Sequence, residues 1–173
     1  MILLGLTGVA GSGKDTVASF LVKEYGFEQY AFADALKRMA EVDFGWDGKK
    51  DDRGRRLLQV LGTEAGREYD PDIWVKKLEW DIFGRQVPPF PLVVISDVRF
   101  ENEAAFIRRR GGDVIRIVGR SYYSPTSPQG SHASEQQMAD IEADLTLVND
   151  GDLCVLHGRI ERLMAVLQDE ESR

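Results

Sequence analysis

A glycine-rich stretch near the start of the chain constrains the fold more than any other feature. Residues 8–16 read Gly-Val-Ala-Gly-Ser-Gly-Lys-Asp-Thr and follow the apolar run 2–6. The pattern Gly-x4-Gly-Lys between a buried strand and a helix is that of a phosphate-binding loop. Apolar residues near helical spacing predict the helix that follows, and Gly26 is its stop signal. We therefore expect a strand, a loop and a helix in this order, rather than a turn that merely ends a strand.

The residue types of this loop suit a phosphate ligand. Glycines let the backbone curl tightly and approach the ligand closely. Backbone amides and the helix N-terminus present donors to the phosphate oxygens, and Lys14 adds a point charge. A serine or threonine usually follows the lysine, whereas here Asp15 follows it and Thr16 comes next. We predict that these loop residues bind phosphates: Gly8, Gly11, Ser12, Gly13, Lys14, Asp15 and Thr16.

Composition narrows the class of protein. The 173 residues suit one domain with a substantial core, and the net charge of -7 argues against broad binding of nucleic acid polymers. A local cluster of arginines could still hold a small anionic ligand. The single cysteine, Cys154, allows no internal disulfide, so we expect a reducing, cytoplasmic setting. We expect no signal peptide, and no apolar run approaches the roughly 20 residues that span a bilayer.

Strand-like apolar runs alternate with helix-like segments, which predicts an α/β domain with a mostly parallel sheet. A long insertion after the second strand and a loop after the fourth strand are the two excursions. Ligands of open α/β sheets bind at the carboxyl ends of the strands, where both excursions emerge. We expect strands at 2–6, 29–33, 92–96, 114–118 and 145–148. We expect helices after the glycine-rich loop, from a cap at Asp34, at 55–61, from a cap at Asp70 to Gly84, at 101–110 and at 152–168, with loops at 43–54 and 120–131.

Two charged residues follow the strand expected at 92–96, whose run of apolar residues is the clearest strand signal of the chain. Asp97 comes directly after it, and a carboxylate there could hold Mg²⁺ through water or could cap the next helix. Arg99 could donate two hydrogen bonds to a phosphate, or could form a surface ion pair with Glu101 or Glu103. We favour the ligand role for Asp97 and leave both roles open for Arg99.

The insertion gathers arginines that could neutralise an anionic acceptor. Tyr69 and Trp74 flank these arginines and could stack on a planar base. Trp74 suits a core position equally well, because it is in register with Leu78 and Ile82. The arginines of the insertion are Arg53, Arg55, Arg56 and Arg67.

The loop after the fourth strand begins at Arg120, which could swing over bound phosphates, and it ends near His132, Ser134 and Glu135. A serine hydrolase is disfavoured, because no serine has the sequence context of a nucleophile elbow. A zinc site is also disfavoured, because the only histidines, His132 and His157, lack metal-ligand spacing.

The chain resembles the deoxynucleoside monophosphate kinase family, known chiefly from bacterial viruses. The likeness rests on blocks that follow the family's order over nearly the whole chain. The blocks are Gly11–Thr16, Phe32–Lys37, Leu57–Glu64, Gly66-Arg67, Trp74, Ile95–Glu103, His132–Glu135 and Asn149–Gly151. The resemblance implies a three-layer α/β P-loop kinase fold in a single domain over 1–173, with a five-stranded parallel sheet and helices on both faces. It also implies a helical acceptor-binding insertion at about 34–90 and a short lid at about 120–132.

The same resemblance implies ATP as phosphoryl donor, Mg²⁺ as cofactor and a deoxynucleoside monophosphate as acceptor. The expected catalytic residues are Lys14, Arg99 and Arg120. Beside the loop, the residue expected to bind ATP is Asn149. The residues expected to hold the metal are Asp15, Thr16 and Asp97. The residues expected at the acceptor are Asp34, Lys37, Arg55, Gln59, Arg67, Trp74, Asp97, Arg99 and Glu135.

Transfer between two phosphates needs positioning and charge compensation more than covalent help, because the acceptor oxygen is already an anion. Two alternatives stay open. One is a kinase of another small phosphorylated metabolite, such as phosphomevalonate, and the other is an ATP-binding switch that is not a kinase. We expect a small-molecule partner and no membrane or nucleic acid polymer. A homodimer is a further expectation, as is the cytoplasm of a bacterial host if the protein is viral.

Overall fold

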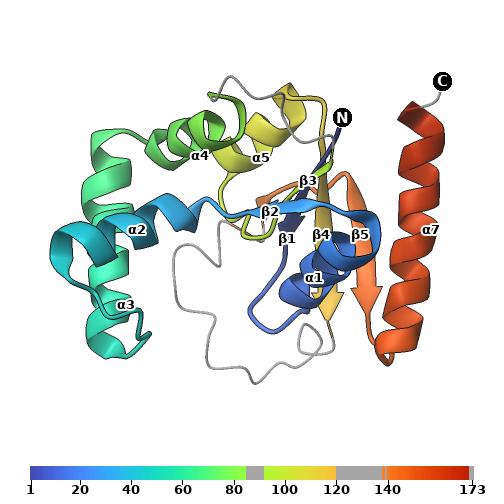
Figure 1. The fold of residues 1–173 in the computed structure, drawn as a ribbon, viewed down its shortest axis with the longest axis horizontal. Helices are drawn as coiled ribbons and strands as arrows, with labels where there is room; N and C mark the ends of the chain where they lie inside the picture. The colour runs from blue at the N-terminus through green and yellow to red at the C-terminus, as the bar shows by residue number, and fades with distance from the viewer. Residues whose placement is uncertain (85–91, 120–137, 139, 172–173) are drawn as a thin grey trace. The chain divides into compact units, whose positions relative to one another are not determined.

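The computed structural model describes residues 1–84, 92–119, 138 and 140–171, and Figure 1 shows the chain as a ribbon. The chain divides into two compact units. One comprises Met1–Gln29 with Phe90–Arg173 and is called the sheet unit here, and the other, Tyr30–Pro89, is called the helical unit. The helical unit nearly coincides in sequence with the insertion expected at 34–90. The lid expected at 120–132 lies outside the described residues.

The sheet unit is built on a five-stranded sheet in the order β2-β3-β1-β4-β5. β1 pairs in parallel with β3 and β4, and β4 pairs in parallel with β5. The sheet that the sequence predicts is thereby confirmed, although β2 ends at Tyr30 because α2 already starts at Ala33. The strands are β1 Ile2–Thr7, β2 Glu28–Tyr30, β3 Leu92–Ile95, β4 Asp113–Gly119 and β5 Leu145–Asn149.

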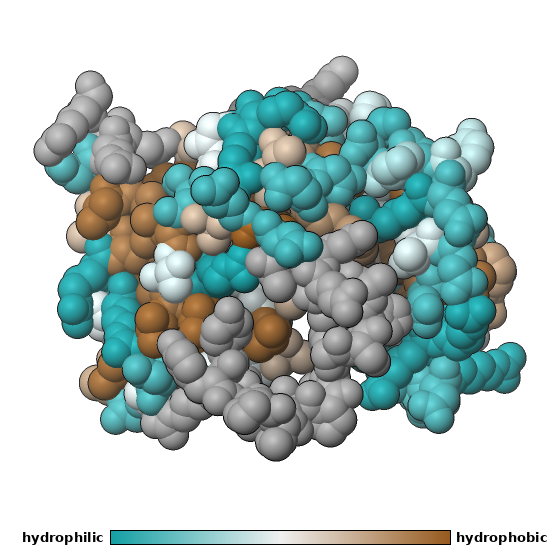
Figure 2. All heavy atoms as spheres, turned by 180° about the vertical axis from the view of Figure 1, so that it is seen from behind, coloured by the Kyte–Doolittle hydropathy of each residue, from teal (hydrophilic) through white to brown (hydrophobic). Residues whose placement is uncertain are grey.

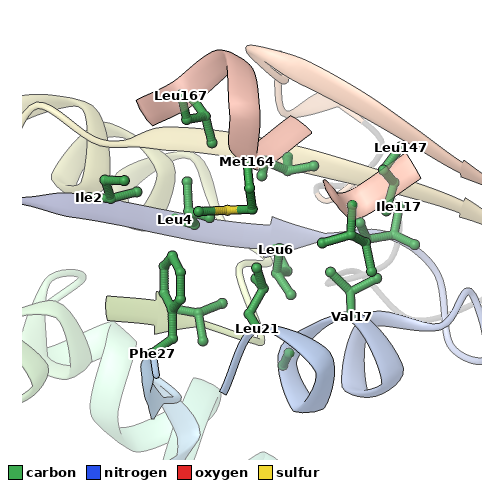
Figure 3. Packing of buried hydrophobic residues seen from close by; sticks show 14 of the residues in the cluster. Ile2, Leu4, Leu6, Val17, Leu21, Phe27, Ile117, Leu147, Met164 and Leu167 are labelled. Carbon is green, nitrogen blue, oxygen red and sulfur yellow. The ribbon is translucent and has the colours of Figure 1, made fainter. Parts of the chain in front are cut away.

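Helices cover both faces of this sheet. Successive side chains of a strand point to opposite faces, so a strand inside the sheet buries side chains against helices on both sides. On one face, Leu4 of β1, Leu21 of α1 and Met164 of α7 belong to one buried cluster (Figure 3). On the other face α5 packs closely, since a Cβ at Gly5 would lie 2.3 Å from Ile107. Each buried aliphatic side chain contributes about 1.5–3 kcal/mol, so both faces stabilise the position of β1. The helices are α1 Lys14–Tyr25, α5 Glu101–Arg109 and α7 Leu153–Glu171.

Residues 30–84, the described part of the helical unit, contain three α-helices and a π-helix. The polar loop expected over 43–54 is shorter in the structure, because α2 continues to Phe44 and the Asp51 carboxylate caps α3 by accepting the N–H of Gly54 at 2.8 Å. The helix expected at 55–61 continues without a break into the π-helix, which reaches Arg67. The elements are α2 Ala33–Phe44, α3 Asp52–Gln59, η1 Val60–Arg67 and α4 Ile73–Phe83.

Both helix caps predicted in the insertion are wrong. Phe32 is the N-cap of α2, and Asp34 lies in the first turn, where its charge still suits the helix dipole. Asp72 is the N-cap of α4. Asp70 lies before the helix, and its carboxylate accepts the N–H of Asp72 at 3.1 Å.

The surface of the sheet unit carries apolar side chains on α7. Leu153, Val155 and Val166 are exposed, and Figure 2 shows hydrophobic atoms gathered on the side of the molecule that carries this helix.

Within the described residues, no helix combines the length and the apolar character needed to cross a bilayer.

Candidate active site

The glycine-rich loop joins β1 to α1, as the sequence predicts, and three of its glycines have backbone conformations that other residues rarely adopt. The angle φ is 144° at Gly8, 76° at Gly11 and 102° at Gly13. Conformations of this kind let backbone N–H groups converge on an anion. Gly13 leads directly into α1, whose N-terminus adds unpaired N–H groups and the positive end of the helix dipole. The loop therefore has the backbone geometry of an anion-binding site.

Lys14 is the first residue of α1, and its side chain folds back over the loop. The ammonium nitrogen Nζ donates to the carbonyl oxygen of Gly8 at 2.5 Å and to that of Val9 at 3.0 Å. The charge is thus held at the loop that the glycines shape. This arrangement supports the role predicted for Lys14 as the cation that meets donor phosphates.

Ser12, in the middle of the loop, is fully buried, and elements far away in the sequence surround it. Its N–H donates to the carbonyl of Val9 at 3.1 Å, and its own carbonyl accepts a hydrogen bond from Asn149 Nδ2 at 2.9 Å. Gly119, the last residue of β4, approaches so closely that a Cβ there would lie 2.8 Å from Ser12 Cα. The ends of β4 and β5 therefore support the loop from outside.

The predicted metal ligands lie at the loop and at the strand beside it. Asp15 and Thr16 are exposed in the first turn of α1. Asp97 is half-buried and follows β3, the neighbour of β1, so the carboxyl ends of both strands meet at one edge of the sheet. Mg²⁺ takes one or two protein oxygens alongside waters and substrate phosphates, so these carboxylates and this hydroxyl fit the ion chemically. Within the described residues, no group of three or more His, Cys, Asp or Glu side chains could hold a metal.

The segment after β3 resolves two alternatives that the sequence leaves open. The N-cap of α5 is Phe100, so Asp97 does not cap this helix. Glu103 accepts the backbone N–H of Arg99, and Glu101 pairs with Arg108, so neither glutamate forms the ion pair considered for Arg99. The guanidinium of Arg99 is exposed and makes no hydrogen bond or ion pair with any described residue. The phosphate role of Arg99 is therefore the better supported of the two.

The acceptor residues expected in the helical unit lie on α2, α3, η1 and α4, and α2 packs against the other three elements. Asp34 and Lys37 form an exposed ion pair on α2, with 2.9 Å between Asp34 Oδ1 and Lys37 Nζ. Arg55 and Gln59 lie on one face of α3, because they are four residues apart. Arg67 is the last residue of η1, and short π-helical segments are frequent at functional sites.

Trp74 lies in the core of the helical unit. Its side chain is 3% exposed, and its indole N–H donates to the carbonyl of Gly62 at 2.9 Å. This burial favours the core role over stacking on a base, and it weakens the argument from Trp74 for a planar acceptor. Tyr69, the other aromatic candidate, is 87% exposed.

Two predicted residues lie outside the described residues, namely Arg120 and Glu135. Sequence reasoning in turn missed the supporting roles of two residues, Gly119 beside the loop and Glu103 beside Arg99. Gly119 carries a signal that could have found it, because a glycine directly after an apolar strand often marks a close approach of another backbone. Glu103 carries only a weak signal, an acidic residue at the third position of a helix.

Comparison with known proteins adds independent evidence. A family model described as Deoxynucleotide monophosphate kinase matches residues 43–160. A candidate deoxynucleotide monophosphate kinase of Acanthamoeba polyphaga mimivirus is 36% identical over 177 residues, which cover 87% of this chain and 89% of the relative. The deoxynucleotide monophosphate kinase of Escherichia phage RB69 is 32% identical over 111 residues, 64% of this chain. The aligned part is 44% of the length of the phage protein.

Solved structures show the same fold at low sequence identity. The shikimate kinase of Aquifex aeolicus vf5 matches with a TM-score of 0.55 at 16% identity, over 98% of this chain and 98% of that chain. At this identity the match establishes the fold, the α/β fold of P-loop kinases, and no more.

Proposed function

Because the chain belongs to the deoxynucleotide monophosphate kinase family, we propose that it transfers the γ-phosphoryl group of ATP to a deoxynucleoside monophosphate. The products are ADP and the deoxynucleoside diphosphate. Membership in this family makes the chain a phosphotransferase, and it agrees with the resemblance read from the sequence blocks. The two alternatives, a kinase of another phosphorylated metabolite and a non-kinase switch, are not favoured by these relatives.

The observation that carries the proposal is the position of Lys14 on the glycine-rich loop. Its ammonium group lies against the carbonyls of Gly8 and Val9, within a loop whose glycines adopt left-handed conformations. Backbone N–H groups of the loop would bind the β- and γ-phosphates, and Lys14 would neutralise charge that accumulates on them. Mg²⁺, held by Asp15 or Thr16 with Asp97, would supply charge stabilisation and orient the phosphates.

The transfer itself asks little covalent chemistry of the protein. An anionic oxygen of the acceptor phosphate attacks the γ-phosphorus, and the bond from that phosphorus to the β–γ bridging oxygen breaks. No general base is needed, because the attacking oxygen carries no proton to remove. The protein aligns the two phosphates and compensates the negative charge of the moving group. Arg99 suits this last task, since its exposed guanidinium is a fork of donors at the sheet edge that also carries Asp97.

Acceptor binding is assigned to the helical unit. Arg55 and Arg67 offer guanidinium groups that match the two negative charges of a monophosphate. Asp34 and Lys37 offer a carboxylate and an ammonium group for the sugar and base. Trp74 is not needed in this scheme, since its ring is buried. Arg120 and Glu135 keep the roles predicted for them, as a catalytic cation and an acceptor contact. A homodimer and a cytoplasmic location likewise stay predictions.

An acceptor panel tests the proposal directly. ADP release from ATP and Mg²⁺ is measured with each deoxynucleoside monophosphate, with the matching ribonucleotides, with phosphomevalonate, with shikimate and with no acceptor. We expect release to depend on a deoxynucleoside monophosphate, and mass spectrometry to find the matching diphosphate. ADP release with phosphomevalonate alone would identify the chain as a kinase of that metabolite. Slow ADP release that no acceptor accelerates would identify it as an ATP-binding switch that is not a kinase.

A further inference from the structure

Asn149 makes a contact that joins the last strand of the sheet to the glycine-rich loop. It is the last residue of β5, and its carboxamide Nδ2 donates to the carbonyl oxygen of Ser12 at 2.9 Å. The two residues are 137 positions apart in the sequence. The resemblance places Asn149 among the residues that bind ATP, whereas the structure shows its amide group engaged with the protein backbone.

The surroundings of this hydrogen bond leave the loop little freedom. A Cβ at Gly13 would lie 2.3 Å from Asn149 Nδ2, so only glycine fits beside the amide. On the other side, a Cβ at Gly119 would lie 2.8 Å from Ser12 Cα. Ser12 is thus enclosed between the carboxyl ends of β4 and β5, with its carbonyl directed at Asn149.

The direction of the Ser12 carbonyl fixes the direction of a donor. The C=O of Ser12 and the N–H of Gly13 belong to one planar trans peptide, so they point in opposite directions. The Gly13 N–H therefore points away from Asn149, and it has no acceptor among the described residues. A backbone donor without an acceptor in an anion-binding loop is suited to a phosphate oxygen.

We propose that Asn149 is a positioning residue that orients the Ser12–Gly13 peptide so that its N–H meets a phosphate of the nucleotide. In this role Asn149 acts on the triphosphate through the loop, without contact to the base. The inference rests on the proposed function only in taking a nucleoside triphosphate as the ligand. It holds for any nucleotide whose phosphates bind in this loop.

Two ligands separate this role from direct recognition of the nucleotide. Inorganic tripolyphosphate has the phosphate chain of ATP and lacks the base and the ribose. The dissociation constants of ATP and of tripolyphosphate are measured by calorimetry for the wild type, Asn149→Ala and Asn149→Asp. We expect Asn149→Ala to weaken the binding of both ligands by the same factor, on the order of tenfold. This factor corresponds to one lost hydrogen bond of about 1.4 kcal/mol. Asn149→Asp should weaken both further, because a carboxylate cannot donate to Ser12 O and repels phosphates.

A matched control lies three residues further along the chain. Asp152 accepts the N–H of Val155 at 2.9 Å in the first turn of α7, and within the described residues it makes no hydrogen bond with the glycine-rich loop. Asp152→Ala should lower the melting temperature through loss of this cap and leave both dissociation constants unchanged.

Each outcome decides the matter. An equal loss of affinity for ATP and for tripolyphosphate in Asn149→Ala supports the positioning role. A loss of affinity for ATP alone overturns this role in favour of a contact between Asn149 and the base or ribose. A lower melting temperature with unchanged affinities overturns it in favour of a purely structural contact. If the wild type bound both ligands and transferred no phosphoryl group, the proposed function would fail and the positioning role would stand. If the wild type bound neither ligand, both would fail.

Discussion

The carboxylate of Glu103 accepts the backbone N–H of Arg99 at 2.7 Å and that of Phe100 at 3.2 Å. Glu103 is 1% exposed, so its side-chain oxygen accepts these two backbone donors inside the protein. These bonds fix the turn between β3 and α5. The same turn carries Asp97 and presents the Arg99 guanidinium to solvent. Glu103 therefore supports two site residues without being exposed itself.

Substitution of Glu103 tests this support. Glu103→Ala removes the acceptor of two partly buried backbone N–H groups, so we expect unfolding in urea to show a loss of about 1–3 kcal/mol. Glu103→Gln keeps one acceptor oxygen and should lose less. Both variants should also raise the Michaelis constant of the acceptor, because the position of Arg99 becomes less defined. Glu101→Gln is the control, since Glu101 is exposed and pairs with Arg108. If substitutions at Glu103 and at Glu101 changed stability and the Michaelis constant equally, Glu103 would have no special role in supporting Arg99.

Lys14→Ala should abolish most of the transfer activity while the fold persists. Removal of the cation leaves donor phosphates without their point charge, and we expect kcat to fall on the order of a hundredfold or more. Circular dichroism should be unchanged, because the lost hydrogen bonds to Gly8 and Val9 lie within one loop. Lys23→Ala is a matched control at the end of the same helix, where Lys23 forms a surface ion pair with Glu24. Near-normal activity of Lys14→Ala would remove this lysine from the mechanism.

Gly119→Ala should disturb the loop from the side of β4. The added Cβ would lie 2.8 Å from Ser12 Cα, a backbone atom in a buried residue, so the loop must shift. Overpacking of this kind costs about 1–3 kcal/mol, and we expect both a lower stability and a several-fold weaker affinity for tripolyphosphate. Gly158→Ala is the control, because a Cβ there meets nothing closer than 4.0 Å within α7. That variant should be neutral or slightly more stable, with unchanged affinity.

The fold could be predicted from the sequence because its signals are local. Apolar runs fix the strands, and the Gly-x4-Gly-Lys spacing fixes the loop between β1 and α1. The contact of Asn149 with Ser12 could not be predicted as a hydrogen bond, since only the folded sheet brings the ends of β1 and β5 to one edge. The π-helix was missed because a helical period of 3.6 residues is the pattern sought in a sequence.

The two wrong helix caps have different physical reasons. Aspartate favours the first turn of a helix as well as the cap, and the sequence does not distinguish these places for Asp34. Asp70 instead accepts the N–H of Asp72 before α4 begins, so its side chain stabilises the turn that leads into the helix. In α2 the cap is Phe32, whose side chain is buried, so packing decides where the helix begins. The burial of Trp74 likewise depends on contacts between elements that the sequence does not display. Its indole N–H donates a hydrogen bond to the carbonyl of Gly62.

The ion pair between Asp70 and Lys76 should make stability depend on pH. The hydrogen bond from Lys76, followed by that from the N–H of Asp72, lowers the pKa of Asp70 below its usual 3.8. A carboxyl with a lowered pKa stabilises the fold above its unfolded value and loses this effect as pH falls through its folded value. We expect a double-mutant cycle of Asp70→Asn and Lys76→Ala to show a small coupling at neutral pH. The coupling should vanish in acid, below the folded pKa, and a coupling that persists there would contradict the assignment.

Arg67→Ala should act on the acceptor and spare ATP. Arg67 ends the π-helix η1, where its Nη1 donates to the carbonyl of Pro71 at 3.4 Å. Loss of a charge-assisted pair with phosphate corresponds to about 1.5–3 kcal/mol, so the dissociation constant of the monophosphate should rise about 10- to 150-fold. Arg67→Lys should restore only part of the affinity, because an ammonium group cannot donate the paired hydrogen bonds of a guanidinium.

The control for Arg67 is Arg38→Ala in the same unit, where Arg38 forms an ion pair with Asp81. It should leave both dissociation constants unchanged. Because Arg67→Ala also removes the bond to Pro71, its melting temperature is measured beside its affinities. An effect confined to ATP would contradict the acceptor role. A fall in stability with an unchanged monophosphate affinity would make Arg67 a structural residue of the turn into α4, and the acceptor phosphate would then need another cation.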